Sequence, residues 1–579
     1  MKPFVISAFL LLTTPLLHAQ NNPPEIIYIH ANFLTGAHLR PNDLSKTPAK
    51  VTAIAVSQGK ITAVGTDANL LKLQAPSTKV IDLNGAFAMP GFNDAHTHIA
   101  SAGQQKLTID LDGTKSLDEM QRRIKTFAST TKSGTWLQGA GWDHTLWPSK
   151  TLPTRADIDA VTQGHPAVFT RTDGHIVIAN TAALAAAGIT SKTPDPPGAK
   201  IDRDASGEPT GIVREGPALA IIYKVIPPPT SEERRRALEV AIADANANGV
   251  TSVQDFSDWE DFLVLEDLER TGNLHLRVSE WLSFDLPVAT LKKLQASHSN
   301  SDLFLHTTML KGFMDGSLGS RTAALNAPYS DDPGNSGIPR YDQAKLNAMT
   351  KERVEAGFQI GFHAIGDHAN HMALEALALF SPCGYHPNSA CSTGGGTTDY
   401  PWGTRPRIEH AQVLLPQDFE RFHLEQIIAS MQPSHLLTDM NWAEARLGPD
   451  RVKYSYAWRS FLDHNVVLAF GTDYPVESIN PFRGLYAAIT RQNEAGTRTY
   501  QPQEKITLNE AIYAYTQASA FAENQEKLKG RLEPDYVADF VVFDHDITSP
   551  TLTPQELLHT QVLRTVLNGE IIYSSKDAR

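Results

Sequence analysis

Cysteine is scarce in this chain of 579 residues, which contains only Cys383 and Cys391. The two residues flank a short polar loop that runs into a glycine-rich stretch. A local disulfide and two free thiols are both compatible with this spacing. Neither cysteine is close in sequence to the candidate site residues below, so a thiol nucleophile is not indicated.

Positive charge is also in deficit. The chain has 51 Lys and Arg residues against 64 Asp and Glu residues, a formal net charge of -13 at pH 7. The acidic residues are spread along the chain, which favours solubility and argues against nucleic acid or an anionic membrane as a partner. We therefore expect a small-molecule substrate, no nucleic acid and no membrane, while the sequence does not indicate an oligomeric state.

Long apolar runs are absent after the first twenty residues. At the start, Lys2 precedes the apolar residues 4–12, Pro15 interrupts them, and the small residue Ala19 offers a cleavage point. This stretch is too short to span a bilayer core of ~30 Å as a helix. A secretory signal over residues 1–19 is favoured over a buried N-terminal helix, and it predicts a secreted, periplasmic protein.

Both ends of the remaining chain have a β-rich texture. Residues 26–34, 51–57 and 60–65 are expected as strands, with a hairpin turn at Gln58-Gly59. Near the C-terminus, residues 538–543 alternate in polarity, and 562–567 lead through Asn568-Gly569 into 570–573. We expect 25–88 and 530–579 to form one composite β-sandwich domain.

The middle of the chain alternates strand-like and helix-like segments, which is typical of a parallel α/β fold. Eight candidate strands end near His98, Asp255, Leu282, Asp315, Ala364, Gln412, Pro433 and Asp473. Eight repeats predict a (β/α)8 TIM-like barrel over residues 89–529. The gap between the first two strands is too long for one helix, so an inserted subdomain is expected over roughly 130–224.

Metal-compatible side chains recur at the ends of these strands. His96 and His98 stand two apart on the first strand, so both can point to one side and bind one ion. His363, His410 and Asp473 end the fifth, sixth and eighth strands. Because the carboxyl ends of barrel strands meet at one face, the sequence predicts one convergent metal site.

Several longer motifs extend this pattern. They are 90–98 with its His-Thr-His, Gly141-Trp142-Asp143, Asp173-Gly174-His175, 311–323, 363–367, Glu409-His410-Ala411-Gln412 and 471–477. In their order, these motifs resemble the amidohydrolase superfamily, and in particular the family 3 branch that includes N-substituted formamide deformylases. The resemblance covers nearly all of the chain after residue 19.

The resemblance implies up to two divalent ions, usually zinc. His96 and His98 would hold one ion with Asp473, and His363 and His410 would hold the second. Lys311 matches the family lysine that becomes carboxylated and bridges the ions, since a carbamate is an anionic ligand whereas an ammonium repels Zn²⁺. The alternative for Lys311 is an ammonium paired with Asp315 or Glu409.

The implied reaction is hydrolysis of a C–N bond in a linear amide or N-substituted formamide. Metal-activated water attacks the carbonyl carbon, and Asp473 acts as general base. The same site acting on a lactone or ester, or as an isomerase, is the first alternative, and a non-catalytic binding protein is the second.

The substrate itself is not identified by the sequence. Five residues are candidate substrate contacts: Trp142, His175, Arg321, His435 and Trp442. For the tryptophans, packing inside the protein is an equally favoured role. Arg321 has the alternative of pairing with Asp315 or Glu477, and His435 that of competing as a metal ligand. The insertion, which carries Trp142 and His175, is expected to fold over the site as a lid.

Overall fold

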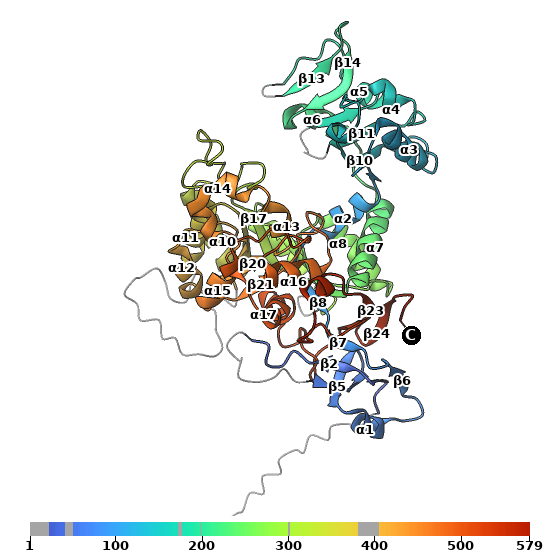
Figure 1. The fold of residues 1–579 in the computed structure, drawn as a ribbon, viewed down its shortest axis with the longest axis vertical. Helices are drawn as coiled ribbons and strands as arrows, with labels where there is room; N and C mark the ends of the chain where they lie inside the picture. Colours follow the sequence, from blue (N-terminus) through green and yellow to red (C-terminus); the bar gives the residue numbers. More distant parts are fainter. Residues whose placement is uncertain are drawn as a thin grey trace, which may run out of the picture.

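A computed structural model of the chain describes residues 23–40, 50–171, 176–196, 199–298, 302–379 and 405–578 (Figure 1). The predicted secretory signal, the loop with Cys383 and Cys391, and His175 lie outside the described residues. Within the described part, no helix combines the length and the apolar composition that a membrane crossing requires.

An eight-stranded parallel sheet forms the centre of the molecule, in the order β21-β20-β19-β18-β17-β16-β15-β8. Its strands are β8 (Phe92–Thr97), β15 (Val250–Asp255), β16 (Arg277–Ser283), β17 (Leu305–Phe313), β18 (Gln359–Ala364), β19 (Arg407–His410), β20 (Ile428–Met431) and β21 (Leu468–Phe470). They lie where the sequence predicted them, and the TIM-like barrel is confirmed.

The barrel closes just beyond its last strand. Thr97 and Tyr474 form a parallel bridge, and the backbone N–H of Asp473 donates to the carbonyl of His96 at 2.7 Å. The N–H of His98 donates to the carbonyl of Tyr474 at 2.8 Å. This closure joins the first strand to the segment after the eighth, and it brings His96, His98 and Asp473 together.

Helices cover the outside of the barrel. They include α2 (Ile99–Lys106), α7 (Ser231–Ala247), α8 (Trp259–Arg270), α9 (Val288–Ala296), α10 (Gln343–Glu355), α11 (Asp367–Ala378), α12 (Asp418–Leu424), α13 (His435–Asp439), α14 (Ala443–Arg451), α15 (Trp458–Asp463), α16 (Pro481–Thr490), α17 (Leu508–Tyr513) and α18 (Ser519–Ala522). The α7 helix starts with a capping box, in which Thr230 and Glu233 satisfy each other's backbone N–H groups. The apolar faces of the barrel helices pack with the strands in one large hydrophobic core.

Two further sheets pack face to face at the end of the barrel where its strands begin. One has the order β5-β4-β1-β6, and the other β24-β23-β22-β7-β2-β3. The strands are β1 (Ile26–Ile29), β2 (Asn32–Leu34), β3 (Lys50–Val51), β4 (Ala53–Ser57), β5 (Lys60–Gly65), β6 (Lys79–Asp82), β7 (Phe87–Pro90), β22 (Phe540–Phe543), β23 (Val562–Leu567) and β24 (Glu570–Ser574). Tyr28, Ile54 and Phe540 belong to one shared core, so the two chain ends build one sandwich.

The insertion has a six-stranded sheet in the order β13-β14-β12-β11-β10-β9. The strands are β9 (Ile109–Asp110), β10 (Leu137–Trp142), β11 (Ala167–Arg171), β12 (Ile176–Ala179), β13 (Lys200–Arg203) and β14 (Pro209–Arg214), accompanied by α3 (Leu117–Ala128), α4 (Arg155–Asp159), α5 (Thr181–Ala186) and α6 (Gly216–Tyr223). It forms a lobe beside α2 and α7 in Figure 1. The edge strand β9 already lies at residues 109–110, so this sheet begins before the expected bound at 130.

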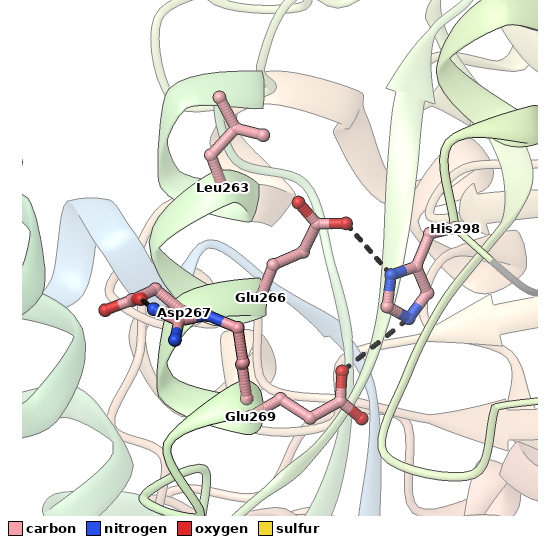
Figure 2. Close-up of a pocket in the computed structure, with 6 residues that line it drawn as sticks. Leu263, Glu266, Asp267, Glu269 and His298 are labelled. Atoms are coloured by element: carbon pink, nitrogen blue, oxygen red, sulfur yellow. Dashed lines mark hydrogen bonds and ion pairs between the residues drawn. The ribbon is translucent and has the colours of Figure 1, made fainter.

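On the outer wall of the barrel, α8 faces the segment after α9. Figure 2 shows His298 between Glu266 and Glu269 of α8. Its Nδ1 lies 3.0 Å from a Glu266 oxygen, while its Nε2 lies 3.7 Å from Glu269 and 3.8 Å from Asp302. Three carboxylates therefore crowd around one imidazole at this place.

Candidate metal centre

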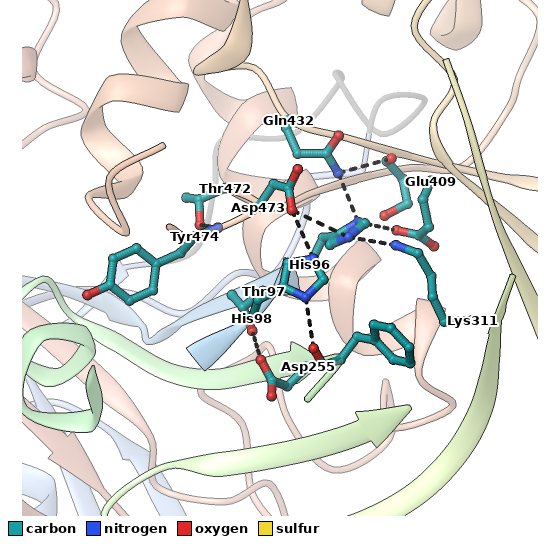
Figure 3. A network of polar contacts seen from close by, with 12 residues as sticks. His96, Thr97, His98, Asp255, Lys311, Glu409, Gln432, Thr472, Asp473 and Tyr474 are labelled. Atoms are coloured by element: carbon teal, nitrogen blue, oxygen red, sulfur yellow. Dashed lines mark hydrogen bonds and ion pairs between the residues drawn. The ribbon is translucent and has the colours of Figure 1, made fainter. Parts of the chain in front are cut away.

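The side chains that the sequence placed at strand ends meet at the carboxyl end of the barrel. Figure 3 shows His96, His98, Lys311 and Asp473 there. His96 lies in β8, His98 follows it, Lys311 is in β17, His363 is in β18, His410 ends β19, and Asp473 follows β21. Parallel barrel strands end at one face, and their side chains there converge. The predicted convergence is what the structure shows.

Asp473 lies between two groups of imidazoles. Its Oδ1 is 3.2 Å from His98 Nε2 and 3.6 Å from His96 Nε2, and its Oδ2 is 3.6 Å from His435 Nε2. The ligand atoms of His96, His98 and Asp473 all lie within 4.8 Å of one another, and so do those of His410, His435 and Asp473. One carboxylate is thus shared by two groups that are each able to hold a metal ion.

The second group differs from the expected one. His435, the first residue of α13, stands in it beside His410, with ring centroids 5.9 Å apart and nearly parallel planes. The ring of His363 is 4.5 Å from that of His410, but its Nε2 lies 3.0 Å from the carbonyl oxygen of Gly316. That bond leaves Nδ1 as the nitrogen of His363 that can face a ligand.

Lys311 is buried at the centre of the barrel. Its Nζ lies 2.7 Å from His96 Nε2 and 5.2 Å from the centroids of both Trp281 and Phe313. Burial lowers the pKa of Lys311 from 10.5 to about 8, although Glu409 and Asp473 oppose this. A buried lysine with so low a pKa is neutral much more often than one on the surface.

Hydrogen bonds from outside the site fix the two histidines of the His-Thr-His motif. The Nδ1 of His96 is 2.8 Å from a Glu409 oxygen, and the Nδ1 of His98 is 2.8 Å from the carbonyl of Phe256. Both acceptors require a proton on Nδ1, so in the neutral ring Nε2 has the lone pair that a metal ion can bind. The sequence analysis did not predict this role of Glu409. The available signal was the spacing of Arg407 and Glu409, two apart on a buried strand, which puts both charged side chains on one face.

The electrostatics favour the neutral form of His96, His363 and His410 and the ionised form of Asp473. Burial, aided by nearby positive charge, lowers the pKa of His96 to about 4 and that of His363 to about 3. Burial raises the pKa of Asp473, but His96 and the hydrogen bond with His98 outweigh it and hold that pKa well below the usual range. Burial likewise opposes the charge of His98, yet Asp473 raises its pKa. Neutral imidazole and ionised carboxylate are the forms that bind metals.

The donors present fit a metal ion. His410 Nδ1 and His435 Nε2 are buried without a hydrogen-bond partner. An unpaired buried polar atom costs free energy, and a ligand that accepts its lone pair removes that cost. His410 and Asp473 also have positive φ angles of 71° and 59°. Residues other than glycine adopt this conformation at a cost, and such strain clusters at functional sites.

The candidate substrate contacts separate into different places. Trp142 is fully buried in the core of the insertion, and its indole N–H donates to the carbonyl of Phe169, so packing explains it and a substrate contact does not. Trp442 is half-buried against Gly319, near the barrel mouth. Arg321 forms two hydrogen bonds with Asp331, which corrects the expected pairing with Asp315 or Glu477.

Comparison with known proteins agrees with this geometry. A model of the amidohydrolase family matches residues 79–573. The chain is 31% identical to the putative amidohydrolase YtcJ of Bacillus subtilis, covering 90% of this chain and 96% of that protein. It is 25% identical to the N-substituted formamide deformylase of Arthrobacter pascens, covering 93% and 98%.

A solved structure is similar to this one over most of the chain. The crystal structure of an uncharacterized metal-dependent hydrolase from Pyrococcus furiosus is 27% identical, with a TM-score of 0.73, and the match covers 92% of this chain and 99% of that one. On this evidence the chain belongs to the amidohydrolase family, and it is a metal-dependent hydrolase.

Proposed function

We propose that the protein hydrolyses a C–N bond in a small linear amide, with an N-substituted formamide as the leading substrate class. The observation that carries this proposal is the carboxylate of Asp473 shared between two imidazole groups. The similarity to an N-substituted formamide deformylase supports the choice of bond. Overall the reaction adds water across the bond and yields a carboxylic acid and an amine.

We propose two ions, of zinc, because histidine and carboxylate donors suit that metal. His96, His98 and Asp473 hold one ion, and His410 holds the other together with His363 or His435. When bound, such ions polarise the scissile carbonyl and lower the pKa of water toward ~7. The neutral amine of Lys311 would add to CO₂, which forms a carbamate and releases one proton, and the carbamate would offer an anionic oxygen to the metal site.

Asp473 moves the proton in this proposal. Its carboxylate accepts a proton from the attacking water and returns it to the leaving nitrogen, because an amide anion is a very poor leaving group. The low pKa of Asp473 keeps the carboxylate ionised at neutral pH. Trp442 and Arg321 lie toward the mouth, where they contact the part of the substrate that does not react.

The first test is elemental analysis of the purified protein and of Lys311→Ala. We expect close to two equivalents of one transition metal in the wild type and a sharp fall in the variant. Lys529→Ala is the matched control, since Lys529 is also a buried lysine but pairs with Glu523 at 2.7 Å at the opposite pole. No metal under metal-replete conditions would overturn the proposal.

Activity is then measured on N-substituted formamides and other linear amides, and afterwards on lactones. Amine release from the formamides, lost in Lys311→Ala and kept in Lys529→Ala, supports the proposed bond. Turnover of lactones alone would contradict the proposed C–N bond. It would not contradict the proposed metal site.

We also propose that the protein is exported to the periplasm. Residues 1–19 have the charge, apolar stretch and small residue of a secretory signal. Expression in a Gram-negative host followed by mass spectrometry tests this. A periplasmic product that begins after Ala19 supports export, and an uncleaved cytoplasmic product contradicts it.

A further inference from the structure

Glu409 is buried between a cation and a metal-site histidine. One carboxylate oxygen, Oε1, accepts from the Nε of Arg407 at 2.6 Å, and the other, Oε2, is 2.8 Å from the Nδ1 of His96. Glu409 has no exposed surface, and Arg407 and His96 are equally buried. Oε1 therefore faces the guanidinium, whereas Oε2 faces the imidazole and also accepts a longer hydrogen bond of 3.3 Å from Nη2 of Arg407.

Arg407 cannot turn away from this arrangement. Its Nη2 donates to the carbonyl of Ala95 and to Ser430 Oγ, both at 2.7 Å, and its Nη1 donates to Gln254. All three nitrogens of the guanidinium are thus engaged inside the barrel. Any side chain at position 409 consequently has to place an oxygen, and not an N–H group, against the Nε–H of Arg407.

A competing donor approaches the same nitrogen of the imidazole. Gln432 Nε2 lies 3.4 Å from His96 Nδ1, and it also donates to the carbonyl of Ser430 at 3.3 Å. Figure 3 shows Gln432 and Glu409 both directed at His96. If this amide N–H donated to Nδ1, that nitrogen would have to be unprotonated. The proton of the neutral ring would then be on Nε2.

We propose that Glu409, oriented by Arg407, is a positioning residue that selects the Nδ1–H tautomer of His96. The tautomer leaves the lone pair of Nε2 on the side of Lys311 and Asp473, where the ion is held. This inference rests on the proposed metal site and adds a residue that touches neither ion nor substrate. Carboxylate partners of this kind raise metal affinity about 10–100-fold.

The variant Glu409→Gln is a sharp test because it keeps the shape and reverses one hydrogen bond. Its amide oxygen has to stay on Arg407, so its NH₂ group faces His96 Nδ1 and donates to it. The ring must then carry its proton on Nε2, where it blocks the ion. We expect Co²⁺ and Zn²⁺ to bind about 10–100-fold more weakly, measured by competition with a chelator.

Glu523→Gln is the matched control. Glu523 is a fully buried glutamate of the same barrel, and it accepts from Lys529 and from Asn93, at 2.7 and 2.6 Å. It does not contact the proposed ligands, so we expect it to change stability and leave the affinity within twofold of the wild type. Equal weakening in both variants would mean a general loss of structure and would overturn the inference.

Two readouts separate tautomer selection from a merely structural role. The visible bands of the Co²⁺ protein should shift in Glu409→Gln and not in Glu523→Gln. In the metal-free wild type labelled with ¹⁵N-histidine, NMR should show His96, assigned by its loss in His96→Asn, protonated on Nδ1. This measurement is made on the wild type and does not require Glu409→Gln to fold. A proton on Nε2 of His96 would overturn the inference.

The outcomes distinguish this inference from the proposed function. Wild-type affinity and spectrum in Glu409→Gln would overturn the role of Glu409 while leaving the metal site intact. A wild-type protein that binds neither Co²⁺ nor Zn²⁺ would overturn both.

Discussion

Among single residues, Asp473 bears most of the proposed chemistry. We expect Asp473→Asn to lower kcat by about 10²–10⁴, because an amide cannot accept the proton of water. KM and metal content are measured on the same sample, since Asp473 also stands in both ligand groups. A fall in kcat with retained metal supports the role as base.

Asp418→Asn serves as the control for that experiment. Asp418 is a fully buried aspartate at the start of α12, where it contacts His371 on the outside of the barrel. We expect it to keep wild-type turnover. If Asp473→Asn retained activity within a factor of ten, the general-base role would be wrong.

Sequence reasoning reached the residues whose position follows from a strand end. His96, His98, Lys311, His410 and Asp473 were placed correctly because parallel strands bring their carboxyl ends to one face. Partners across the barrel are not encoded in spacing. The contact of Glu409 with His96 and the burial of Trp142 depend on how distant segments pack. Arg321 pairs with Asp331, ten residues further on in the connection from β17 to α10, where no regular pattern marks the partner.

At the scale of elements, the contact of α2 with α7 helps to hold the metal centre in position, because α2 begins directly after His98. A Cβ on Gly103 of α2 would lie 1.9 Å from the carbonyl oxygen of Ala237 in α7. Replacing glycine by alanine inside a helix usually gains ~1 kcal/mol. Here the contact is with backbone, and overpacking of ~1–3 kcal/mol outweighs that gain. We expect Gly103→Ala to lower Tm and weaken metal binding.

Gly216→Ala is the matched control. Gly216 begins α6 of the insertion, and a Cβ there would meet no atom within 4 Å. We expect its Tm to equal or exceed that of the wild type. A Gly103→Ala variant as stable as Gly216→Ala would show that the two helices do not need this close approach.

The facing surfaces of α8 and the segment after α9 predict a pH effect. Burial, together with repulsion from Asp302, raises the pKa of Glu269 from 4.5 to about 7. The unfolded chain binds its proton less tightly, so the folded state loses stability as pH rises from 4.5 through 7. We expect Glu269→Gln to have the wild-type Tm at pH 4 and a higher Tm above pH 7.

The comparison needs a second variant, because Glu269→Gln also changes the net charge. Glu260→Gln removes one carboxylate from an exposed position of the same helix. Tm is measured for the three proteins between pH 4 and 9. A difference between Glu269→Gln and the wild type that stays constant over this range would contradict the assigned crowding with Glu266, Asp302 and His298.

Element boundaries show where local sequence signals are sufficient. The barrel strands were predicted closely, because buried strands leave clear patterns. The short edge strand β9 was not predicted, since two residues have no periodicity to recognise. Its place in the sheet follows from pairing with β10, which is a tertiary contact.

For the whole molecule, the barrel and the sandwich are tied by a buried ion pair. Arg277 of β16 and Asp539, just before β22, form two hydrogen bonds of 2.5 and 2.9 Å. Asp539 also accepts from the backbone N–H of Asn568 at 2.8 Å. Sequence separation between the partners is 262 residues, so the pair connects the middle of the chain to its end.

Removing one partner leaves the other charge buried and unpaired. We expect Asp539→Ala and Arg277→Ala each to destabilise the protein by about 3–5 kcal/mol, whereas the exposed Asp450→Ala changes little. The double variant Arg277→Met/Asp539→Leu replaces both charges with apolar side chains and should recover much of the loss. Tm and the unfolding transition in urea are measured for the wild type and all four variants. If the double variant lost as much as the sum of the single variants, the two residues would act independently and the proposed tie between the domains would be wrong.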